Sequence, residues 1–354
     1  MTHAHAHAHS AVFALPGDIN TLTGGYIYDR RLVAGLRDQG RQVQVLSLPD
    51  SFPTPDASQM AAAMAQLLAL PADVPVIIDG LAFGALDTVA LQNMRAPVIA
   101  MIHHPLAQES ALPADLADHL FRTERANLRM ARHIIVPSPH TKQMLVERYD
   151  VAPQHITIAR PGTLARKGSI KGPVSSPPLI LSVGILHPRK GHDVLIDALG
   201  QLTDLDWQAV IVGNPWDGDY VRDLNDRITA SGLGERLRLA GKLPDDDLQA
   251  LYGKASVFAL ATRYEGYGIV FDEALSHGLP IVSTRTGAVP DTVPQDAGIL
   301  VPVDDATAFA NALRDMLADP HRRDIFAKAA AEAGAILPDW AQTAEIAGQV
   351  IDNL

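Results

Sequence analysis

The segment Tyr264-Glu265-Gly266-Tyr267-Gly268-Ile269-Val270-Phe271-Asp272-Glu273 places two carboxylates, Glu265 and Glu273, eight positions apart across a glycine-rich turn. The residues after the turn predict a helix, because apolar side chains recur at helical spacing before a stop signal of Gly278 and Pro280. The apolar positions are Val270, Phe271, Ala274 and Leu275. At about 100° per residue, Glu273 lies away from the centre of this stripe and is expected on the unburied side.

The turn before this predicted helix has the chemistry of an anion site. A helix N-terminus presents free backbone N–H groups and a partial positive charge, and both favour a phosphate. Carboxylates beside the turn accept hydrogen bonds from hydroxyl groups. The combination indicates a site for a nucleotide-sugar. The alternative is an ordinary surface helix with solvated glutamates, and for Glu273 taken alone that alternative is favoured.

Composition limits the classes of protein to consider. With 354 residues, 47% of them hydrophobic, the chain is long enough for two domains with real cores. The absence of cysteine excludes disulfides, thiolate metal ligands and a cysteine nucleophile. The formal net charge of −11 and the lack of a basic stripe argue against a nucleic-acid partner.

The N-terminus carries four histidines that alternate with alanine, His3, His5, His7 and His9. A zinc or nickel site is conceivable there, but residues 1–10 are better explained as a purification tag or a disordered tail. We find no signal peptide and no apolar window of membrane-spanning length. A cytoplasmic location is therefore expected.

Short β-branched segments alternate with helical patterns and predict an α/β protein with two doubly wound parallel sheets. In the first half the predicted strands are 11–15, 42–48, 75–79, 97–102, 133–136 and 155–159, with helices near 25–40, 56–70, 115–132 and 138–149. In the second half they are 178–184, 208–213, 236–240, 256–260, 280–284 and 298–301.

The predicted organisation is two Rossmann-like domains, residues 11–164 and 178–337, joined by a linker over residues 165–177 that is rich in turn-forming residues. Because ligands of doubly wound sheets bind beyond the carboxyl ends of strands, we expect a cleft between the two domains. A dinucleotide oxidoreductase would use similar sheets. No G-x-G-x-x-G follows residue 15 or residue 184, so that interpretation is weak.

Three further loops that follow predicted strands carry candidate site residues. Gly24-Gly25 opens a helix, and its N–H groups can approach a phosphate or sugar closely, although a plain tight turn explains it equally well. His103-His104 ends a strand and can bind a sugar hydroxyl; the alternative is a structural pair. For a metal site these histidines lack carboxylate or histidine partners nearby in the sequence.

The third loop contains adjacent cations. Arg189-Lys190 lies between a predicted strand and the helix that begins at His192, where the pair can clamp a diphosphate. A solvated loop is the alternative, but the predicted common sheet edge with Glu265 and Glu273 favours a site. The acidic run Asp245–Asp247 follows Pro244 and is better explained by a helix N-terminus than by a metal.

Several motifs together resemble the retaining GT-B glycosyltransferases of family 4, over nearly the whole chain. They are Ser182-Val-Gly184 with Pro188-Arg-Lys-Gly191, the 264–274 segment, Gly278-Leu-Pro-Ile-Val-Ser283, Gly24-Gly25, His103, Val136-Pro-Ser138 with Thr141, and Arg160-Pro-Gly162. The resemblance implies two Rossmann-like domains and a nucleotide-sugar donor held mainly by the second, with no metal or other cofactor. It also implies a final helix, within residues 338–354, that returns to the first domain.

The resemblance further implies roles for individual residues. Glu273 binds the ribose hydroxyls, and Glu265 binds hydroxyls of the transferred sugar. Arg189 and Lys190 hold the diphosphate, assisted by backbone N–H groups around Gly268 and Ile269. His103 lies beside the donor sugar, and Gly24-Gly25 lies near the phosphate and the acceptor. Catalytic roles are thus expected for Glu265, His103, Lys190 and Arg189. One departure is Ile185, where many relatives have an arginine.

The expected reaction is metal-independent transfer of a sugar, with retention, to an acceptor that is a glycan, a lipid-linked saccharide or a small molecule. The cations and the helix N-terminus at Gly268 would stabilise charge on the leaving phosphate. Two alternatives stay open on the same architecture, namely a nucleotide-sugar epimerase and a non-catalytic subunit that binds nucleotide-sugar. The identity of the nucleobase, the sugar and the acceptor does not follow from the sequence.

An arginine stripe suggests one further contact. Arg122, Arg125, Arg129 and Arg132 recur on one face of a predicted helix. The stripe predicts a weak peripheral contact with the inner face of a membrane or with an anionic acceptor. A solvated helix face, with the arginines paired to Glu124 or other neighbouring acids, is the favoured alternative.

Overall fold

The structure is a computed structural model that describes residues 10–21, 23–109, 112–163 and 175–354. It divides into two compact units, Met1–Gly162 together with Pro338–Leu354 (unit 1) and Thr163–Leu337 (unit 2). The N-terminal histidines and most of the predicted linker lie outside the described residues. The predicted cleft concerns the placement of the two units relative to each other, and it stays a prediction.

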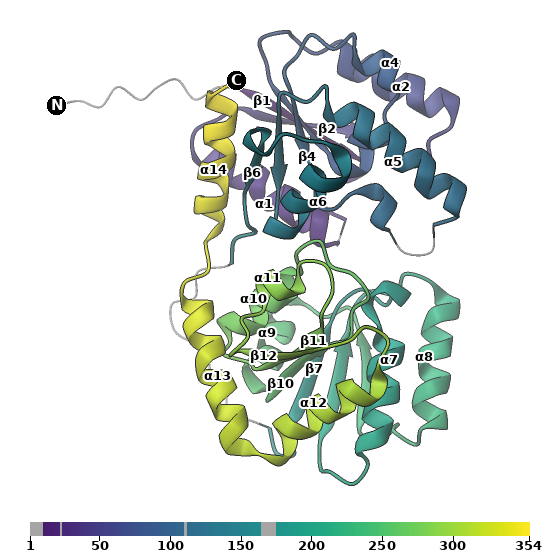
Figure 1. Cartoon of the computed structure of the whole chain (residues 1–354), viewed down its shortest axis with the longest axis vertical. Helices are drawn as coiled ribbons and strands as arrows, with labels where there is room; N and C mark the ends of the chain where they lie inside the picture. The colour runs from purple at the N-terminus through teal and green to yellow at the C-terminus, as the bar shows by residue number, and fades with distance from the viewer. Residues whose placement is uncertain (1–9, 22, 110–111, 164–174) are drawn as a thin grey trace, which may run out of the picture. The chain divides into compact units, whose positions relative to one another are not determined.

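Unit 1 contains a six-stranded parallel sheet with the strand order β2-β1-β3-β4-β5-β6 (Figure 1). Each strand overlaps one predicted from the sequence. The strands are β1 (Ala11–Pro16), β2 (Val43–Leu48), β3 (Val76–Asp79), β4 (Val98–Met101), β5 (His133–Val136) and β6 (Ile156–Ile158). The continuous apolar character of β1, β3 and β4 reflects burial of the central part of the sheet on both faces.

The helices of unit 1 include the four predicted in the first half of the chain. They are α1 (Gly24–Asp38), α2 (Ala57–Leu68), α3 (Gly80–Phe83), α4 (Thr88–Leu91), α5 (Ala114–Leu128), α6 (Pro139–Tyr149) and α14 (Trp340–Asp352), with 3₁₀ turns η1 (Leu106–Gln108) and η2 (Pro153–His155). The single-turn helices α3 and α4 were not predicted, since four residues are too few to show a helical period.

The final helix, α14, packs against α1 of unit 1, as the family resemblance implies (Figure 1). The two helices approach closely because Gly35 carries no side chain: a Cβ there would lie 2.6 Å from the Cβ of Ala344. Thr343 donates a hydrogen bond of 2.7 Å to the carbonyl of Arg160. The ring of Trp340 meets that of Tyr28 edge-on, with centroids 5.5 Å apart. These contacts make α14 part of the first unit's core.

Unit 2 contains a second parallel sheet with the order β12-β11-β10-β7-β8-β9. All six strands overlap predicted ones. They are β7 (Leu179–Val183), β8 (Gln208–Val212), β9 (Leu237–Gly241), β10 (Val257–Leu260), β11 (Ile281–Thr284) and β12 (Gly298–Val301). The helices are α7 (His192–Leu199), α8 (Gly218–Ala230), α9 (Asp245–Lys254), α10 (Ile269–Ser276), α11 (Val289–Thr292), α12 (Ala306–Ala318) and α13 (Pro320–Ala335), with η3 (Pro188–Lys190) and η4 (Gly200–Leu202).

Two hydrophobic cores enclose this second sheet. One is built around Trp207 and Phe309, and the other around Phe258 and Phe271. The structure confirms the predicted fold class of two doubly wound, Rossmann-like units. Among the described residues, no helix combines the length and the apolar character needed to span a bilayer.

Each sheet has a position where the direction of the strand order reverses, and ligands of such sheets bind beyond the carboxyl ends of the strands there. In unit 1 this position lies between β1 and β3, and in unit 2 it lies between β7 and β10. These two sheet edges are therefore where binding residues are expected.

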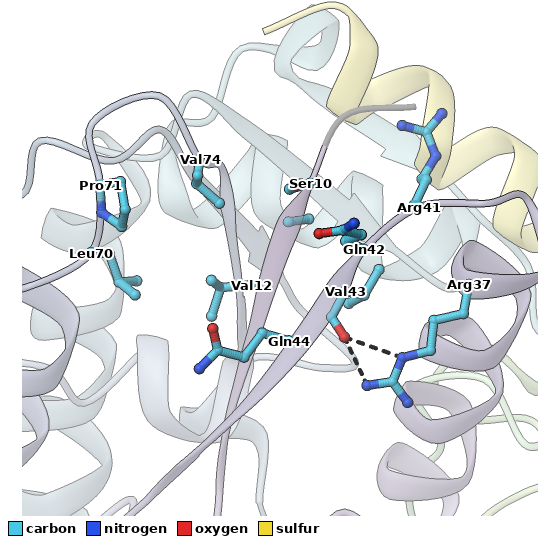
Figure 2. Close-up of a pocket in the computed structure, with 11 residues that line it drawn as sticks. Ser10, Val12, Arg37, Arg41, Gln42, Val43, Gln44, Leu70, Pro71 and Val74 are labelled. Carbon is cyan, nitrogen blue, oxygen red and sulfur yellow. Dashed lines mark hydrogen bonds between the residues drawn. The ribbon is translucent and has the colours of Figure 1, made fainter. Parts of the chain in front are cut away.

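A cavity of about 460 Å³ lies at the opposite end of the first sheet, at the first residues of β1 and β2 (Figure 2). Val12 and Val43 line it, and the guanidinium of Arg37 donates to the carbonyl of Val43 at 3.1 and 2.7 Å. Because it sits at the amino ends of the strands, the cavity is separate from the predicted site.

Candidate functional site

The site in unit 2 is built from the loops that leave β7 and β10, which are neighbours in the sheet. Gly191 allows these loops to meet. Its φ of +63° lies in the left-handed region, and a Cβ there would lie 1.9 Å from the carbonyl oxygen of Ala261. The N–H of Arg263 donates to the carbonyl of Arg189 at 2.7 Å. The cationic loop is thereby fixed against the end of β10.

Glu265 and Lys190 form a buried ion pair within this site. Nζ of Lys190 lies 2.6 Å from Oε1 of Glu265, and Nη1 of Arg189 lies 3.8 Å from Oε2. Glu265 is 4% exposed, and Oγ1 of Thr262 also lies 3.1 Å from its Oε1. Burial opposes ionisation of this carboxyl, but the charges of Lys190 and then Arg189 outweigh it, so the pKa of Glu265 is lowered. The carboxylate is therefore ionised at neutral pH and orients Lys190.

Arg189 is held by the backbone around it. Its Nη1 donates a hydrogen bond of 3.0 Å to the carbonyl of Tyr264, and its own N–H donates to Nδ1 of His187 at 3.0 Å. The structure thus brings together Arg189, Lys190 and Glu265, as predicted from their loops.

Helix α10 begins directly after the turn, with Gly268 as its N-cap residue at a φ of +90°. In the part of the chain that the structure describes, no side chain caps this end of the helix with a hydrogen bond. The first backbone N–H groups of α10 therefore begin around Gly268 and Ile269, at the same sheet edge as the cationic loop.

Glu273 is half-buried rather than fully projecting into solvent. The hydroxyl of Tyr252, a buried residue of α9, donates to its Oε2 at 2.8 Å. Tyr252 was missed by sequence reasoning, as was Thr262. Thr262 lies two residues after the end of β10. Its position beyond the carboxyl end of a strand could have marked it as a site candidate.

In unit 1, Gly24 and Gly25 open α1 next to His103. Thr23 caps the helix, and its Oγ1 accepts from the N–H of Tyr26 at 3.4 Å. A Cβ on Gly25 would lie 3.2 Å from Cδ2 of His103, whereas one on Gly24 would meet nothing within 4 Å. Gly25 thus makes room for the imidazole, whereas the space beside Gly24 is open among the described residues.

The expectation that His103 has no carboxylate partners is wrong, because two carboxylates from distant parts of the sequence lie next to its ring. Its Nε2 lies 2.9 Å from Oδ1 of Asp29 and 3.5 Å from Oδ2 of Asp79. Both carboxylates are buried, and neither was singled out from the sequence. Signals existed: Asp79 ends a buried strand, and Asp29 lies three and four residues before Leu32 and Val33 on the buried face of α1. These three side chains lie close enough together to hold a metal ion.

The arginine stripe is paired with acids at most of its positions. Arg122 pairs with Asp118, and Arg125 and Arg129 pair with Asp150. Glu124 is not a partner of the stripe, because it is fully buried and accepts from the N–H of Leu106 at 3.0 Å. Arg132 lies beyond the end of α5. The ion pairs account for the stripe without a membrane.

The acidic run Asp245–Asp247 forms the first turn of α9, as the helix N-terminus explanation predicts. Carboxylates there interact favourably with the partial positive charge of the helix end.

Comparison with known proteins identifies the family. Residues 24–163 match the family described as Glycosyltransferase Family 4, and residues 168–333 match that described as Glycosyl transferases group 1. The chain belongs to glycosyltransferase family 4. Its two Rossmann-like units are those of the GT-B fold. Sucrose-phosphate synthase from Thermosynechococcus elongatus shares this fold, with a TM-score of 0.80 and 22% identity over 97% of this chain and 98% of that one.

Two curated members of the family show the range of similarity. A GDP-mannose-dependent α-(1-6)-phosphatidylinositol monomannoside mannosyltransferase of Mycolicibacterium smegmatis is 36% identical over 41% of this chain and 40% of its own length. A GDP-mannose-dependent monoacylated α-(1-6)-phosphatidylinositol monomannoside mannosyltransferase of Corynebacterium glutamicum is 29% identical over 78% of this chain and 76% of its own. The chain thus spans less than half the length of the first relative.

Ile185 stands where many members of the family have an arginine. Leu186, the next residue, is buried, and it forms a bridge with Pro215 that ties the loop to the end of β8. Arg189 and Lys190 are therefore the cations that this family member's loop presents at the sheet edge.

Proposed function

We propose that this protein is a glycosyltransferase that moves a sugar from a nucleoside-diphosphate sugar to an acceptor saccharide, lipid-linked saccharide or small molecule. The observation that carries the proposal is the cluster at the β7–β10 edge of unit 2. Two cations, one ionised buried carboxylate and an uncapped helix end converge there. This combination suits a diphosphate joined to a sugar.

The diphosphate is assigned to Lys190, Arg189 and the first N–H groups of α10. Lys190 supplies a point charge and Arg189 a planar fork, and both are held in place before a ligand arrives. Breaking the bond between sugar and phosphate develops negative charge on the leaving group. Donors preoriented toward that charge stabilise the transition state more than the ground state.

The hydroxyl groups of the donor are assigned to the two glutamates. Glu273, oriented by Tyr252, is proposed to accept from the ribose, and Glu265 is proposed to accept from the transferred sugar with the lone pairs that Lys190 and Thr262 leave. His103 is proposed to lie beside the sugar. Gly24 and Gly25 are proposed to lie near the phosphate and the acceptor.

The reaction is proposed to retain the anomeric configuration without a metal ion. The cationic loop and the helix end supply the positive charge that a divalent cation supplies to many phosphoryl leaving groups. Same-face attack, in which the leaving phosphate accepts the proton of the acceptor hydroxyl, satisfies retention without a nucleophile from the protein.

The test is a panel of GDP-mannose, UDP-glucose and ADP-glucose in buffer containing a chelator, with thermal shift and nucleotide release as the readouts. GDP-mannose comes first because it is named for both curated relatives. We expect one donor to raise the melting temperature and to release nucleotide when an acceptor mixture is present. Product analysis by NMR gives the anomeric configuration.

Other results would redirect the assignment. Conversion of the donor into an epimer without acceptor would identify an epimerase. Binding without release under every condition would identify a non-catalytic subunit, and an absolute need for divalent metal would contradict the metal-free scheme.

A further inference from the structure

Three ionisable side chains from three separate elements meet at the carboxyl edge of the sheet in unit 1. Asp29 comes from α1, Asp79 ends β3 and His103 lies shortly after β4. Asp29 is 1% exposed, Asp79 is 5% exposed and the side chain of His103 is 18% exposed. The two carboxylates thus lie behind a histidine that is partly open to ligands.

The imidazole ring is oriented on several sides. Its Nε2 faces Asp29 at 2.9 Å and Asp79 at 3.5 Å. The ring of Tyr28 meets it edge-on, with centroids 5.1 Å apart, and the bare backbone of Gly25 lies against its Cδ2 edge. Within the described part of the chain, the hydrogen bond and the ion pairs of the ring are made through Nε2. Among the described residues, Nδ1 makes none of these contacts.

The charge in this cluster calls for a proton on the ring. Asp29 and Asp79 have no ion pair with a lysine or arginine among the described residues. The other titratable groups of α1 beside the cluster, Tyr26 and Tyr28, have pKa values raised, by burial first and then by the carboxylates, so both are neutral. Buried carboxylates without a compensating charge are costly, and the imidazolium is the compensation at hand.

We propose that Asp29 and Asp79 are positioning residues that hold the His103 ring through Nε2–H and keep it protonated, so that Nδ1–H donates to an oxygen of the bound sugar. The sugar contact rests on the proposed function. The protonation and orientation of the ring do not depend on it.

The pKa directions agree with this arrangement. Burial by itself lowers the pKa of His103, but Asp29 first and Asp79 next outweigh it, and the net shift is upward. Burial and then the charge of Asp29 raise the pKa of Asp79, with His103 offsetting part of the effect. Asp29 is the closer counter-ion of the ring, since its Oδ1 lies 2.9 Å from Nε2 and Oδ2 of Asp79 lies 3.5 Å away.

A divalent cation would neutralise the same carboxylates, but it would need the Nε2 lone pair. The proposal places a proton on that nitrogen, so the two arrangements exclude each other. They are distinguished by titrating the metal alone.

The first experiment is an NMR pH titration of the ring signals of His103 in the full-length protein, assigned by comparison with His103→Gln. We expect a midpoint above the ordinary 6.5 in the wild type. Asp29→Asn is expected to lower the midpoint by about 1 to 3 pH units, and Asp79→Asn by less. Glu109→Gln is the matched control. It removes the carboxylate that lies 3.1 Å from His104 and should leave His103 unchanged.

The second experiment measures kcat/KM against pH, with the donor that the nucleotide-sugar panel identifies. A wild-type profile that falls at high pH, with the fall moved to lower pH in Asp29→Asn, supports the positioning role, since a merely structural defect would lower activity at every pH. A wild-type midpoint at or below 6.5 overturns the proposal, and this measurement does not depend on the aspartate variants. A different outcome is loss of the His103 signals on adding micromolar Zn²⁺ or Mn²⁺ to the wild type but not to Asp29→Asn. That outcome would overturn the protonated ring and identify a cation site in its place.

If no nucleotide-sugar is turned over by the wild type, the proposed function fails while the NMR titration still decides the state of the ring. If turnover occurs and His103 titrates normally, only the present inference fails.

Discussion

The two sheet edges of this protein assemble opposite kinds of charge. At the β7–β10 edge of unit 2, two cations surround one carboxylate, Glu265, and the surplus charge is positive. At the β1–β3 edge of unit 1, two carboxylates surround one imidazole, that of His103. The same strand-order reversal therefore supports a cluster with surplus positive charge in one unit and a carboxylate-rich cluster in the other.

The difference teaches that the fold supplies the place and the side chains supply the chemistry. In unit 2 the carboxylate of Glu265 holds Lys190 in place through their ion pair. In unit 1 the carboxylates serve the imidazole, since they determine its protonation and direction. The following predictions test the two sides of this contrast, and the last one, at a residue outside both clusters, provides the baseline.

The largest effect is expected from Lys190→Ala. Removing one preoriented cation from the leaving-group site should lower kcat by about 10²- to 10³-fold. The measurement is nucleotide release under saturating donor and acceptor, on protein shown to be folded by circular dichroism. Lys254→Ala is the matched control, because Lys254 is exposed in the last turn of α9. An equal loss in both variants would remove Lys190 from the mechanism.

Glu273→Ala is expected to weaken donor binding with a smaller effect on turnover. Hydrogen bonds to a charged group are worth about 1.5–3 kcal/mol, which corresponds to a rise in donor Kd of about 10- to 100-fold. Tyr252→Phe retains the carboxylate and removes only its orienting hydroxyl, so its Kd should rise less. Calorimetry with the donor checks both variants, and a larger effect for Tyr252→Phe would contradict the assignment.

The two clusters should respond to pH in opposite directions. The pKa of Glu265 is lowered in the folded state, so its contribution to stability is present above about pH 4.5 and is lost as pH falls through the folded value. The pKa of His103 is raised, so its contribution is present below about pH 6.5 and is lost as pH rises through the folded value. Each contribution is worth about 1.4 kcal/mol per unit of difference between the folded and unfolded pKa.

Hydrogen exchange in β10 and in β4, corrected for intrinsic rates, measures this contrast unit by unit. In β10, the protection from exchange that wild type has over Glu265→Gln should become smaller as the pH is lowered. In β4, the protection from exchange that wild type has over His103→Gln should become smaller as the pH is raised. Parallel pH dependence in both units would show that the two clusters do not differ in the way described.

The smallest effect is expected from Arg122→Ala, which lies outside both clusters. Arg122 and Asp118 are both well exposed, so the free energy of unfolding should change by no more than about 0.5 kcal/mol, and turnover should be unchanged. Sedimentation with anionic vesicles provides the decisive comparison. A clear loss of vesicle binding in this variant would restore the membrane interpretation of the stripe.

Local patterns in the sequence determined much of the architecture. All twelve strands were predicted, because most are short apolar runs bounded by turn signals, and burial of the central strands on both faces enforces that composition. The motif of Glu265, Gly268 and Glu273 was equally visible, because these residues are close together in the chain. The loop with Arg189 and Lys190 follows a strand, which suffices to assign it to the carboxyl edge.

The tertiary structure alone decided which side chains meet at each edge. Lys190 reaches Glu265 because β7 and β10 are neighbours, and Asp79 reaches His103 because β3 and β4 are. Asp29 joins them from a helix, across 74 residues of sequence. Strand order depends on how helices pack over the whole sheet, and no local period encodes it. The sequence by itself therefore determined the elements and the Glu265–Glu273 motif, whereas the imidazole–carboxylate cluster follows only from the order of the strands and the packing of α1.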